Sequence, residues 1–399
     1  MPIEGSTINV NRADSTELET PPSSLPVEFI STEDKSRKPQ QGIALCLSGG
    51  GYRAMLFHLG ALIRLNELKQ LPNLTRVSSV SGGSITAGLL GLKWTKLNFE
   101  NGIATRLLEE VVDPIRKLAA KTIDVLSALV GIVTGGAASR VAHEYRNYLF
   151  GNATLQDLPE QPRFVINATN VQSKALWRFS RPYMWDWRVG KVEKPTIELA
   201  TAVAASSAFP PVLSPLELRL DPREFVPNTG AGLQREPFTS DVVLTDGGVY
   251  DNLGLETAWK EYSTIWVSDG GGMYAPEEHP HRDWLRHTVR VFDLVDNQVR
   301  TLRKRQLIDS FASGLRTGAY WSLWQDIAEY KVDAPLPCPA DKTQKLAQTP
   351  TRLEGLDGEL QERLINWGYA ICDASMRAYG GMNSRKPPTG FPYPGVGVG

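Results

Sequence analysis

Cysteine is scarce in this sequence, and the few cysteines form no pattern. Cys46, Cys338 and Cys372 are three residues in a chain of 399, far apart and without a CxxC pair. Widely spaced cysteines in an odd number favour neither a disulfide framework nor a zinc site, and they fit a reducing compartment. A DxDxDG calcium-loop pattern is also missing. We therefore expect no metal and no cofactor.

The chain also lacks an excess of charge of one sign. Lys and Arg total 43 and Asp and Glu total 44, which gives a formal net charge of −1 at pH 7. This balance excludes a protein that binds nucleic acid in bulk. Hydrophobic residues make up 41% of the chain and charged residues 22%, so the sequence can bury a full core and is not broadly disordered.

No apolar run is long enough to span a membrane. The most apolar stretch, residues 125–138, is shorter than the roughly 20 residues that a spanning helix needs. Residues 1–41 are rich in Ser, Thr, Pro and Glu and lack the apolar region of a signal peptide. We expect a cytoplasmic protein with a flexible tail over residues 1–41 and a Gly/Pro-rich tail over residues 381–399.

Short apolar runs alternate with stretches of helical periodicity and are joined by Gly-rich turns. The runs predict strands, and the spacing predicts helices over residues 53–69, from Gly83 to before Trp94, over 284–307 and over 353–379. This alternation predicts an α/β layered fold with a central, mostly parallel sheet flanked by helices and a C-terminal helical part. Ligand sites in such folds lie at the carboxyl ends of strands. The strands are predicted at residues 43–47, 77–80, 163–168, 242–245 and 264–268.

The first predicted strand ends in three consecutive glycines directly before a helix. Free amides at the start of a helix bind anions, and glycine lets the backbone approach the bound group closely. Phosphate binding and stabilisation of an oxyanion during acyl transfer both fit such a turn. The nucleotide interpretation lacks support, because neither a GK[ST] motif nor GxGxxG spacing is present. These residues are Gly49, Gly50 and Gly51, followed by Arg53.

The second predicted strand ends in Ser81, which is followed by two glycines and a helix. A serine in a sharp turn between a strand and a helix has the geometry of a nucleophile elbow. Ser79 stands where the GxSxG motif has its first glycine, so the match is incomplete. Ser84 offers a second register, but it lies inside the predicted helix. A serine that merely caps the helix is the structural alternative.

A nucleophilic serine needs a base, and the five histidines have no turn motif around them. Asp246 and Asp269 each follow an apolar strand and precede glycines, so both are candidates. An aspartate at a strand end is usually only a turn residue. The residues alone leave both aspartates open, together with a triad in the order Ser81, Asp246, His287.

Four segments together resemble, in order and spacing, the motifs of the patatin-like phospholipase family. This is a family of serine–aspartate lipid acyl hydrolases related to cytosolic phospholipase A2. The resemblance implies a catalytic domain over residues 42–275, with residues 276–380 forming a helical part on the same domain. The segments are SGGGYR from Ser48, VSGGS from Val80, AASSAFPP from Ala204 and DGGVYDN from Asp246.

The resemblance also implies a function and the residues that perform it. Ser81 would be the nucleophile and Asp246 its base, and the oxyanion hole would comprise Gly49, Gly50, Gly51 and Arg53. The reaction would cleave fatty acyl esters of phospholipids or lysophospholipids through an acyl-enzyme, on a protein peripheral to a membrane. Residues 105–138 would form either a lid or docking helix or core helices. A ligand-regulated effector phospholipase, a lipid- or nucleotide-binding module and a homo-oligomer stay open.

Overall fold

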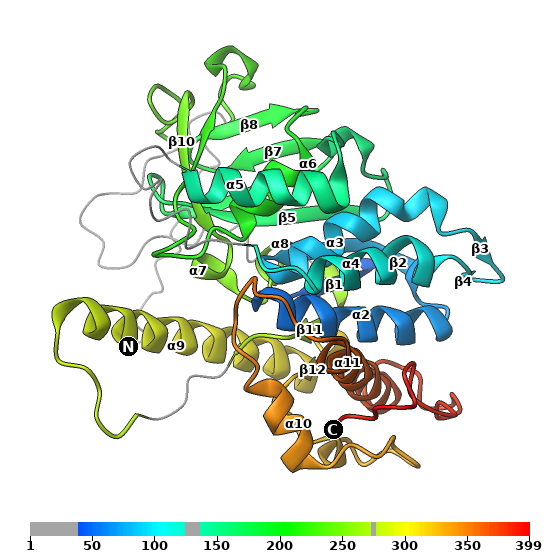
Figure 1. Cartoon of the computed structure of the whole chain (residues 1–399). Helices are drawn as coiled ribbons and strands as arrows, with labels where there is room; N and C mark the ends of the chain where they lie inside the picture. The colour runs from blue at the N-terminus through cyan, green and yellow to red at the C-terminus, as the bar shows by residue number, and fades with distance from the viewer. Residues whose placement is uncertain (1–38, 124–135, 273–276) are drawn as a thin grey trace, which may run out of the picture. The chain divides into compact units, whose positions relative to one another are not determined.

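A computed structural model describes residues 39–123, 136–272 and 277–399 of the chain (Figure 1). One large sheet carries the order β12-β11-β1-β2-β5-β6-β7-β8, and β10 pairs with both β5 and β9. The strands from β12 to β5 are parallel, whereas the pairs beyond β5 are antiparallel. The bounds are β1 Gln40–Leu47, β2 Leu74–Val80, β5 Arg163–Asn170, β6 Ala175–Phe179, β7 Tyr183–Asp186, β8 Gly190–Glu193, β9 Leu216–Arg219, β10 Asp241–Asp246, β11 Tyr262–Asp269 and β12 Thr317–Ser322.

Strand β1 shows why the parallel strands read as continuous apolar runs. Its side chains alternate between two hydrophobic cores, one on each face of the sheet. Leu45 and Leu47 face the larger core, and Ala44 and Cys46 face the smaller one. Helices cover both faces, which is the arrangement that a parallel sheet requires. The predicted α/β fold is therefore confirmed.

Helices contribute to both cores and flank the sheet (Figure 1). The larger core takes side chains from α2, α3, α4, α5, α6, α10 and α11, and the smaller core takes them from α8 and α9. The bounds are α2 Gly51–Glu67, α3 Gly82–Lys93, α4 Asp113–Ala119, α5 Gly136–Tyr145, α6 Leu199–Ser206, α7 Gly248–Asp251, α8 Glu256–Trp259, α9 Trp284–Ala312, α10 Ala340–Ala347 and α11 Gly358–Ala378.

The five strands and four helices expected from the sequence are all present, with shifted ends. The periodicity of residues 284–307 correctly predicts a helix, but not which of its faces packs on the protein. Val295 and Leu302 of α9 belong to the apolar spacing and yet are exposed, whereas Leu307 is buried. The periodic pattern indicates a helix without identifying its buried side.

The segment 105–138, expected to supply a lid or core helices, packs in the core over most of its described part. Residues 124–135 lie outside the described residues, and so does most of the predicted N-terminal tail. Among the described residues of this segment, the large aliphatic side chains are buried, apart from Leu108. They are Leu107, Val111, Val112, Ile115, Leu118 and Ile123.

Helices α2 and α11 cross so closely that glycine is required at the contact. A Cβ atom added to Gly60 would lie 1.9 Å from the carbonyl oxygen of Ile365, and one added to Gly368 would lie 1.9 Å from that of Phe57. Both obstructing atoms belong to helix backbones, which cannot rotate away as a side chain can. Beside this crossing, the Arg64 guanidinium lies 2.7 Å from the Asp373 carboxylate. The crossing therefore fixes α11 against the core.

We expect Gly60→Ala to lower the free energy of unfolding by about 1–3 kcal/mol or more, because overpacking forces the helices apart. Helix propensity alone would give the opposite sign, with alanine favoured by about 1 kcal/mol. Gly358→Ala is the matched control, because a Cβ atom at Gly358 would meet no atom within 4 Å. Denaturant unfolding measures both changes. An unchanged midpoint for Gly60→Ala would contradict the close crossing.

Candidate active site

Strand β5 brings together two strand ends that are far apart in the sequence. Its register pairs Val80, the last residue of β2, with Asn167. The next residue along β5, Ala168, pairs with Asp246 at the end of β10. Because β2 is parallel to β5 and β10 is antiparallel, the two strands end at neighbouring positions along β5. The turn after β2, which begins at Ser81, therefore starts beside Asp246.

Ser81 stands in a strained backbone conformation between β2 and α3. Its φ of 51° and ψ of −121° are rare for a residue other than glycine. The turn is also tightly enclosed, because a Cβ atom at Gly82 would lie 2.2 Å from the Gly51 carbonyl oxygen and one at Gly83 would lie 2.4 Å from that of Leu47. Only glycine fits at these two positions, so the sequence Ser-Gly-Gly matches the turn.

Hydrogen bonds from buried serines hold this turn in place. The backbone N–H of Ser81 donates to Ser206 Oγ at 2.9 Å, and the Ser206 hydroxyl donates to the Asn167 carbonyl at 2.6 Å. Ser84, the second register considered from the sequence, is fully buried, and its Oγ lies 2.9 Å from Ser206 Oγ and 3.0 Å from Ser79 Oγ. Ser84 thus belongs to the support of the turn, whereas Ser81 is partly exposed.

The glycine turn at the start of α2 packs directly against the Ser81 turn. A Cβ atom added to Gly49 would lie 3.2 Å from Ser81 Cβ. The Gly49 amide is already used, since it donates to the Asn252 carbonyl at 3.0 Å. Gly50 and Gly51 have φ values of 143° and 61°, which favour glycine. Within the described part of the chain, neither of their amides donates a backbone hydrogen bond, so both can bind an anion.

Arg53 stabilises this glycine turn through hydrogen bonds to backbone carbonyls. Its guanidinium is buried and donates to the Gly270 carbonyl at 3.3 Å and to the Thr349 carbonyl. The amide of Tyr52 in the same turn of α2 donates to the Arg352 carbonyl at 3.1 Å. The C-terminal part of the chain therefore anchors the start of α2, and the Arg53 charge is directed at backbone oxygens.

Asp246 is a buried carboxyl group with an unusually high pKa. Its side chain is 2% exposed, and Oδ1 accepts a 2.6 Å hydrogen bond from the Gly248 amide. Burial raises the pKa of Asp246 from 3.8 to about 7, and the charge of Asp296 on α9 adds to the rise. The Gly248 amide and the Ser81 hydroxyl oppose this rise in pKa. Oδ2 is buried without a hydrogen bond of regular geometry within the described residues, which leaves one oxygen open toward a proton donor.

Asp269, the rival candidate, is engaged in a different contact. Its carboxylate accepts from Arg300 Nη2 at 3.1 and 3.2 Å and from the Tyr320 hydroxyl at 2.7 Å. Burial raises the pKa of Asp269, but the Arg300 charge and these hydrogen bonds outweigh it, so the net pKa is lowered. This carboxylate is ionised and held by its partners, as expected for a structural ion pair.

The five histidines are either held by other contacts or exposed to solvent. Both ring nitrogens of His58 are used, at 2.8 Å from Ser268 Oγ and 2.9 Å from the Ser48 carbonyl oxygen, and burial lowers its pKa to about 4. His287 is exposed on α9. The remaining three, His143, His279 and His281, are exposed as well.

Three residues of the site were not singled out from the sequence. Ser206 and Asn252 lie inside the motifs quoted above, but no local rule assigns them a role. Tyr145 from α5 is fully buried, and its pKa is raised mainly by burial and further by the charge of Asp246, so its phenol is near the carboxylate. Only the three-dimensional arrangement reveals these contacts. No group of three His, Cys, Asp or Glu side chains suited to a metal ion occurs in the described ranges.

The comparisons with known proteins identify the family and support the fold. The sequence model of the patatin-like phospholipase family matches residues 45–259, and the chain belongs to that family. The structure of human GIVD cytosolic phospholipase A2 is similar, with a TM-score of 0.51 and 14% identity. That similarity covers 86% of this chain and 63% of the human protein, so the chain spans less than two thirds of its length.

VipD from Legionella pneumophila is a more distant structural neighbour. Its TM-score is 0.33 and its identity is 16%, over 83% of this chain and 66% of VipD. The search of curated proteins returned no match. None of the helices that the structure describes is long and apolar enough to cross a membrane.

The raised pKa of Asp246 predicts that Asp246→Asn stabilises the fold at alkaline pH. A carboxyl group with a folded pKa of about 7 and an ordinary pKa of 3.8 binds more protons when folded than when unfolded between these values. Stability of the native protein should therefore fall as pH rises from about 4 to 7, by roughly 4 kcal/mol from this group. The Asp246→Asn variant has no carboxyl group that titrates at this position, so it should not lose this stability as pH rises. Its Oδ1 can still accept the hydrogen bond from the Gly248 amide.

Unfolding titrations of both proteins at pH 4.5 and pH 8 measure this effect. The variant should gain stability relative to the native protein between the two values. An equal difference at both pH values would contradict the buried, high-pKa carboxyl group.

Proposed function

We propose that the protein is a lipid acyl hydrolase of the phospholipase A or lysophospholipase type, with Ser81 as nucleophile and Asp246 as its base. The observation that carries this proposal is the meeting of β2 and β10 on β5. It sets a strained, partly exposed serine beside a buried carboxyl group with an open oxygen. Membership of the patatin-like phospholipase family supports a lipid substrate.

The chemistry follows from these groups. Ser81 Oγ attacks the ester carbonyl carbon while its proton passes to Asp246, and the carbonyl oxygen becomes an oxyanion. Collapse of this intermediate expels the alcohol, which takes the proton back, and leaves a fatty acyl ester on Ser81. Water then attacks the acyl carbon while one of its protons passes to Asp246. The bond between that carbon and Ser81 Oγ breaks, Ser81 Oγ takes the proton back from Asp246, and the fatty acid leaves.

Two features would allow the Asp246 carboxylate to act as the base for Ser81. A base is most effective when its pKa is near the working pH, and burial brings the pKa of Asp246 to about 7. The oxyanion would be stabilised by the amides of Gly50 and Gly51, at the positive end of α2. Gly49 and Arg53, the other two residues assigned to the oxyanion hole, would hold this loop in place through Asn252 and Gly270.

Ser81→Ala should abolish ester hydrolysis, whereas Ser84→Ala should retain at least a tenth of it. Ser84 donates to the support of the turn and has no place in the reaction, so its loss weakens the turn without removing the nucleophile. Hydrolysis of a mixed-chain phospholipid and covalent labelling by a fluorophosphonate measure both variants. Labelling of Ser81→Ala protein at the native rate would overturn the assignment.

The dependence of kcat/KM on pH should reflect the ionisation of Asp246. Because the base must be ionised, kcat/KM should rise about tenfold per pH unit below about 7 and level off above it. The kcat/KM of the Asp246→Asn variant should be lower than that of the native protein by about 10³-fold or more. The kcat/KM of Asp269→Asn should be lowered much less, and its pH profile should keep the inflection near pH 7. Removal of divalent metal ions by a chelator, and the His287→Ala substitution, should each leave the pH dependence of kcat/KM unchanged. A loss of about 10³-fold in folded His287→Ala protein would favour the triad instead.

A further inference from the structure

Asn252, directly after α7, lies where the glycine turn before α2 meets the turns of Ser81 and Asp246. Its backbone carbonyl accepts a hydrogen bond from the Gly49 amide at 3.0 Å. A Cβ atom added to Gly49 would lie 2.3 Å from Asn252 Oδ1 and 3.2 Å from Ser81 Cβ. Because a single point is this close to both side chains, the Asn252 carboxamide occupies the space next to the candidate nucleophile.

The same carboxamide also contacts the turn that holds the candidate base. A Cβ atom added to Gly248 would lie 2.8 Å from Asn252 Oδ1 and 2.9 Å from Asp246 Oδ1. The amide of Gly248 is the donor that binds Asp246 Oδ1 at 2.6 Å. The Asn252 carboxamide therefore packs against two glycines. Gly49 belongs to the loop assigned to the oxyanion hole, and Gly248 belongs to the turn that binds the Asp246 carboxyl group.

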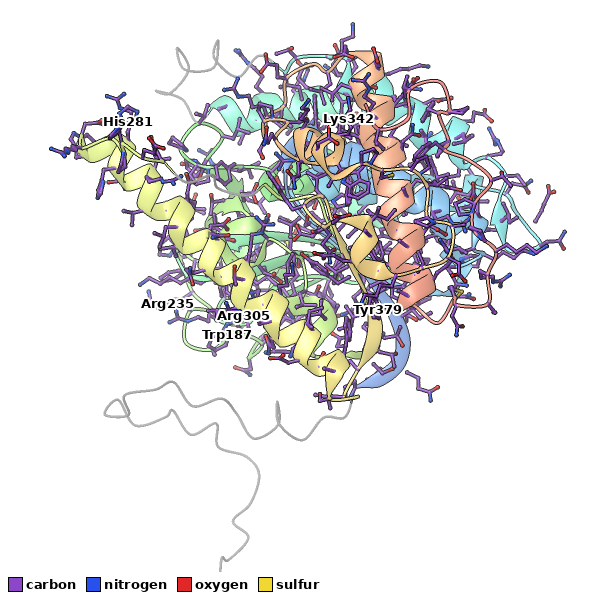
Figure 2. All side chains as sticks on the ribbon, turned by 90° about the horizontal axis from the view of Figure 1, so that it is seen from below. Trp187, Arg235, His281, Arg305, Lys342 and Tyr379 are labelled. Carbon is purple, nitrogen blue, oxygen red and sulfur yellow. The ribbon has the colours of Figure 1, made fainter. Side chains whose placement is uncertain are left out.

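The residue before Asn252 anchors this part of the backbone to the rest of the protein. Asp251 is buried, and its carboxylate accepts a hydrogen bond from the Glu256 amide at 2.6 Å. Arg303 of α9 lies 3.6 Å from the same carboxylate, two residues before Arg305, which is labelled on α9 in Figure 2. These contacts restrict the backbone next to Asn252, so its carboxamide is held between the two glycines.

Asparagine has the shape of aspartate without its charge, and this difference matters beside Asp246. A carboxylate at position 252 would face the Asp246 carboxyl group, and neighbouring like charges disfavour the ionised form. The titratable groups whose charges couple to Asp246 are Asp296 of α9 and Tyr145 of α5. Asn252 fills the space between the two turns without adding a charge to these groups.

We propose that Asn252 is a positioning residue that sets the spacing between the glycine turn of the oxyanion hole and the turn of Asp246. It acts through Gly49 and Gly248 and not by touching the substrate. A misplacement of about 1 Å at a reacting group can cost about 10²-fold in rate, so this spacing affects catalysis. The inference rests on the proposed function, which assigns the two turns their roles, but the place of the carboxamide can be tested without catalysis.

Unfolding titrations of the full chain test the place of the carboxamide. Asn252→Asp should raise the pKa of Asp246 further, so the folded variant loses more stability as pH rises. Its denaturation midpoint should therefore fall further between pH 4.5 and pH 8 than that of the native protein. The matched control is Asn73→Asp, at an exposed position before β2 and at the opposite end of that strand from Ser81. This control should fall as the native protein does, whereas an equal fall in Asn252→Asp would overturn the proposal.

Hydrolysis of a soluble short-chain ester tests the positioning itself. In Asn252→Ala, kcat should fall tenfold or more while KM changes less than twofold, because the substrate loses no contact. In Asn252→Asp, the inflection of kcat/KM should move up by one pH unit or more, whereas Asn73→Asp should keep the native profile. A native kcat in Asn252→Ala, or a native inflection in Asn252→Asp, would overturn the proposal.

The two measurements separate this proposal from the proposed function. A native protein that hydrolyses no ester would overturn the proposed function. A larger fall of the denaturation midpoint in Asn252→Asp would then still support the place of the Asn252 carboxamide beside Asp246.

Discussion

The pairing of β5 with two different strands along one edge is the constraint on which the site depends. β2 runs parallel to β5 and ends opposite Asn167, and β10 runs antiparallel and ends opposite Ala168. Hydrogen-bonded strands are held about 4.8 Å apart, so the register places the two strand ends with little freedom. The Ser81 turn then has room only for glycine at its next two positions, because Gly51 fills the space beside Gly82 and the end of β1 fills the space beside Gly83.

The same packing gives Asp246 its chemical character. A carboxyl group on an exposed loop would have an ordinary pKa near 4 and would be a weak base for an alcohol. Burial at the end of β10 raises the pKa of Asp246 and leaves Oδ2 without a regular partner, which costs folding stability. Asp269 shows the contrast, since Arg300 and Tyr320 satisfy its carboxylate and lower its pKa. The two aspartates have similar local sequences, but their different environments shift their pKa values in opposite directions.

Much of this arrangement could be predicted from the sequence, because its signals are local. Apolar runs and glycine turns located the strands around Ser81 and Asp246. The antiparallel direction of β10 and its register depend on long-range pairing, which no local pattern contains. The same limit applies to α9, where Val295 and Leu302 face solvent and the ion pairs of Arg300 and Arg303 hold the helix against the protein. Arg53, expected to contribute to the oxyanion hole, donates to the carbonyls of Gly270 and Thr349.

The central claim is that Ser81 carries the acyl group during ester cleavage. Rapid acid quenching of the protein with a phospholipid, followed by peptide mass spectrometry, tests it most directly. We predict a fatty acyl ester on the peptide that contains Ser81, which forms within one turnover and disappears when substrate is exhausted. An acyl group on another residue, or fatty acid release at full rate without any acylated peptide, would contradict this account.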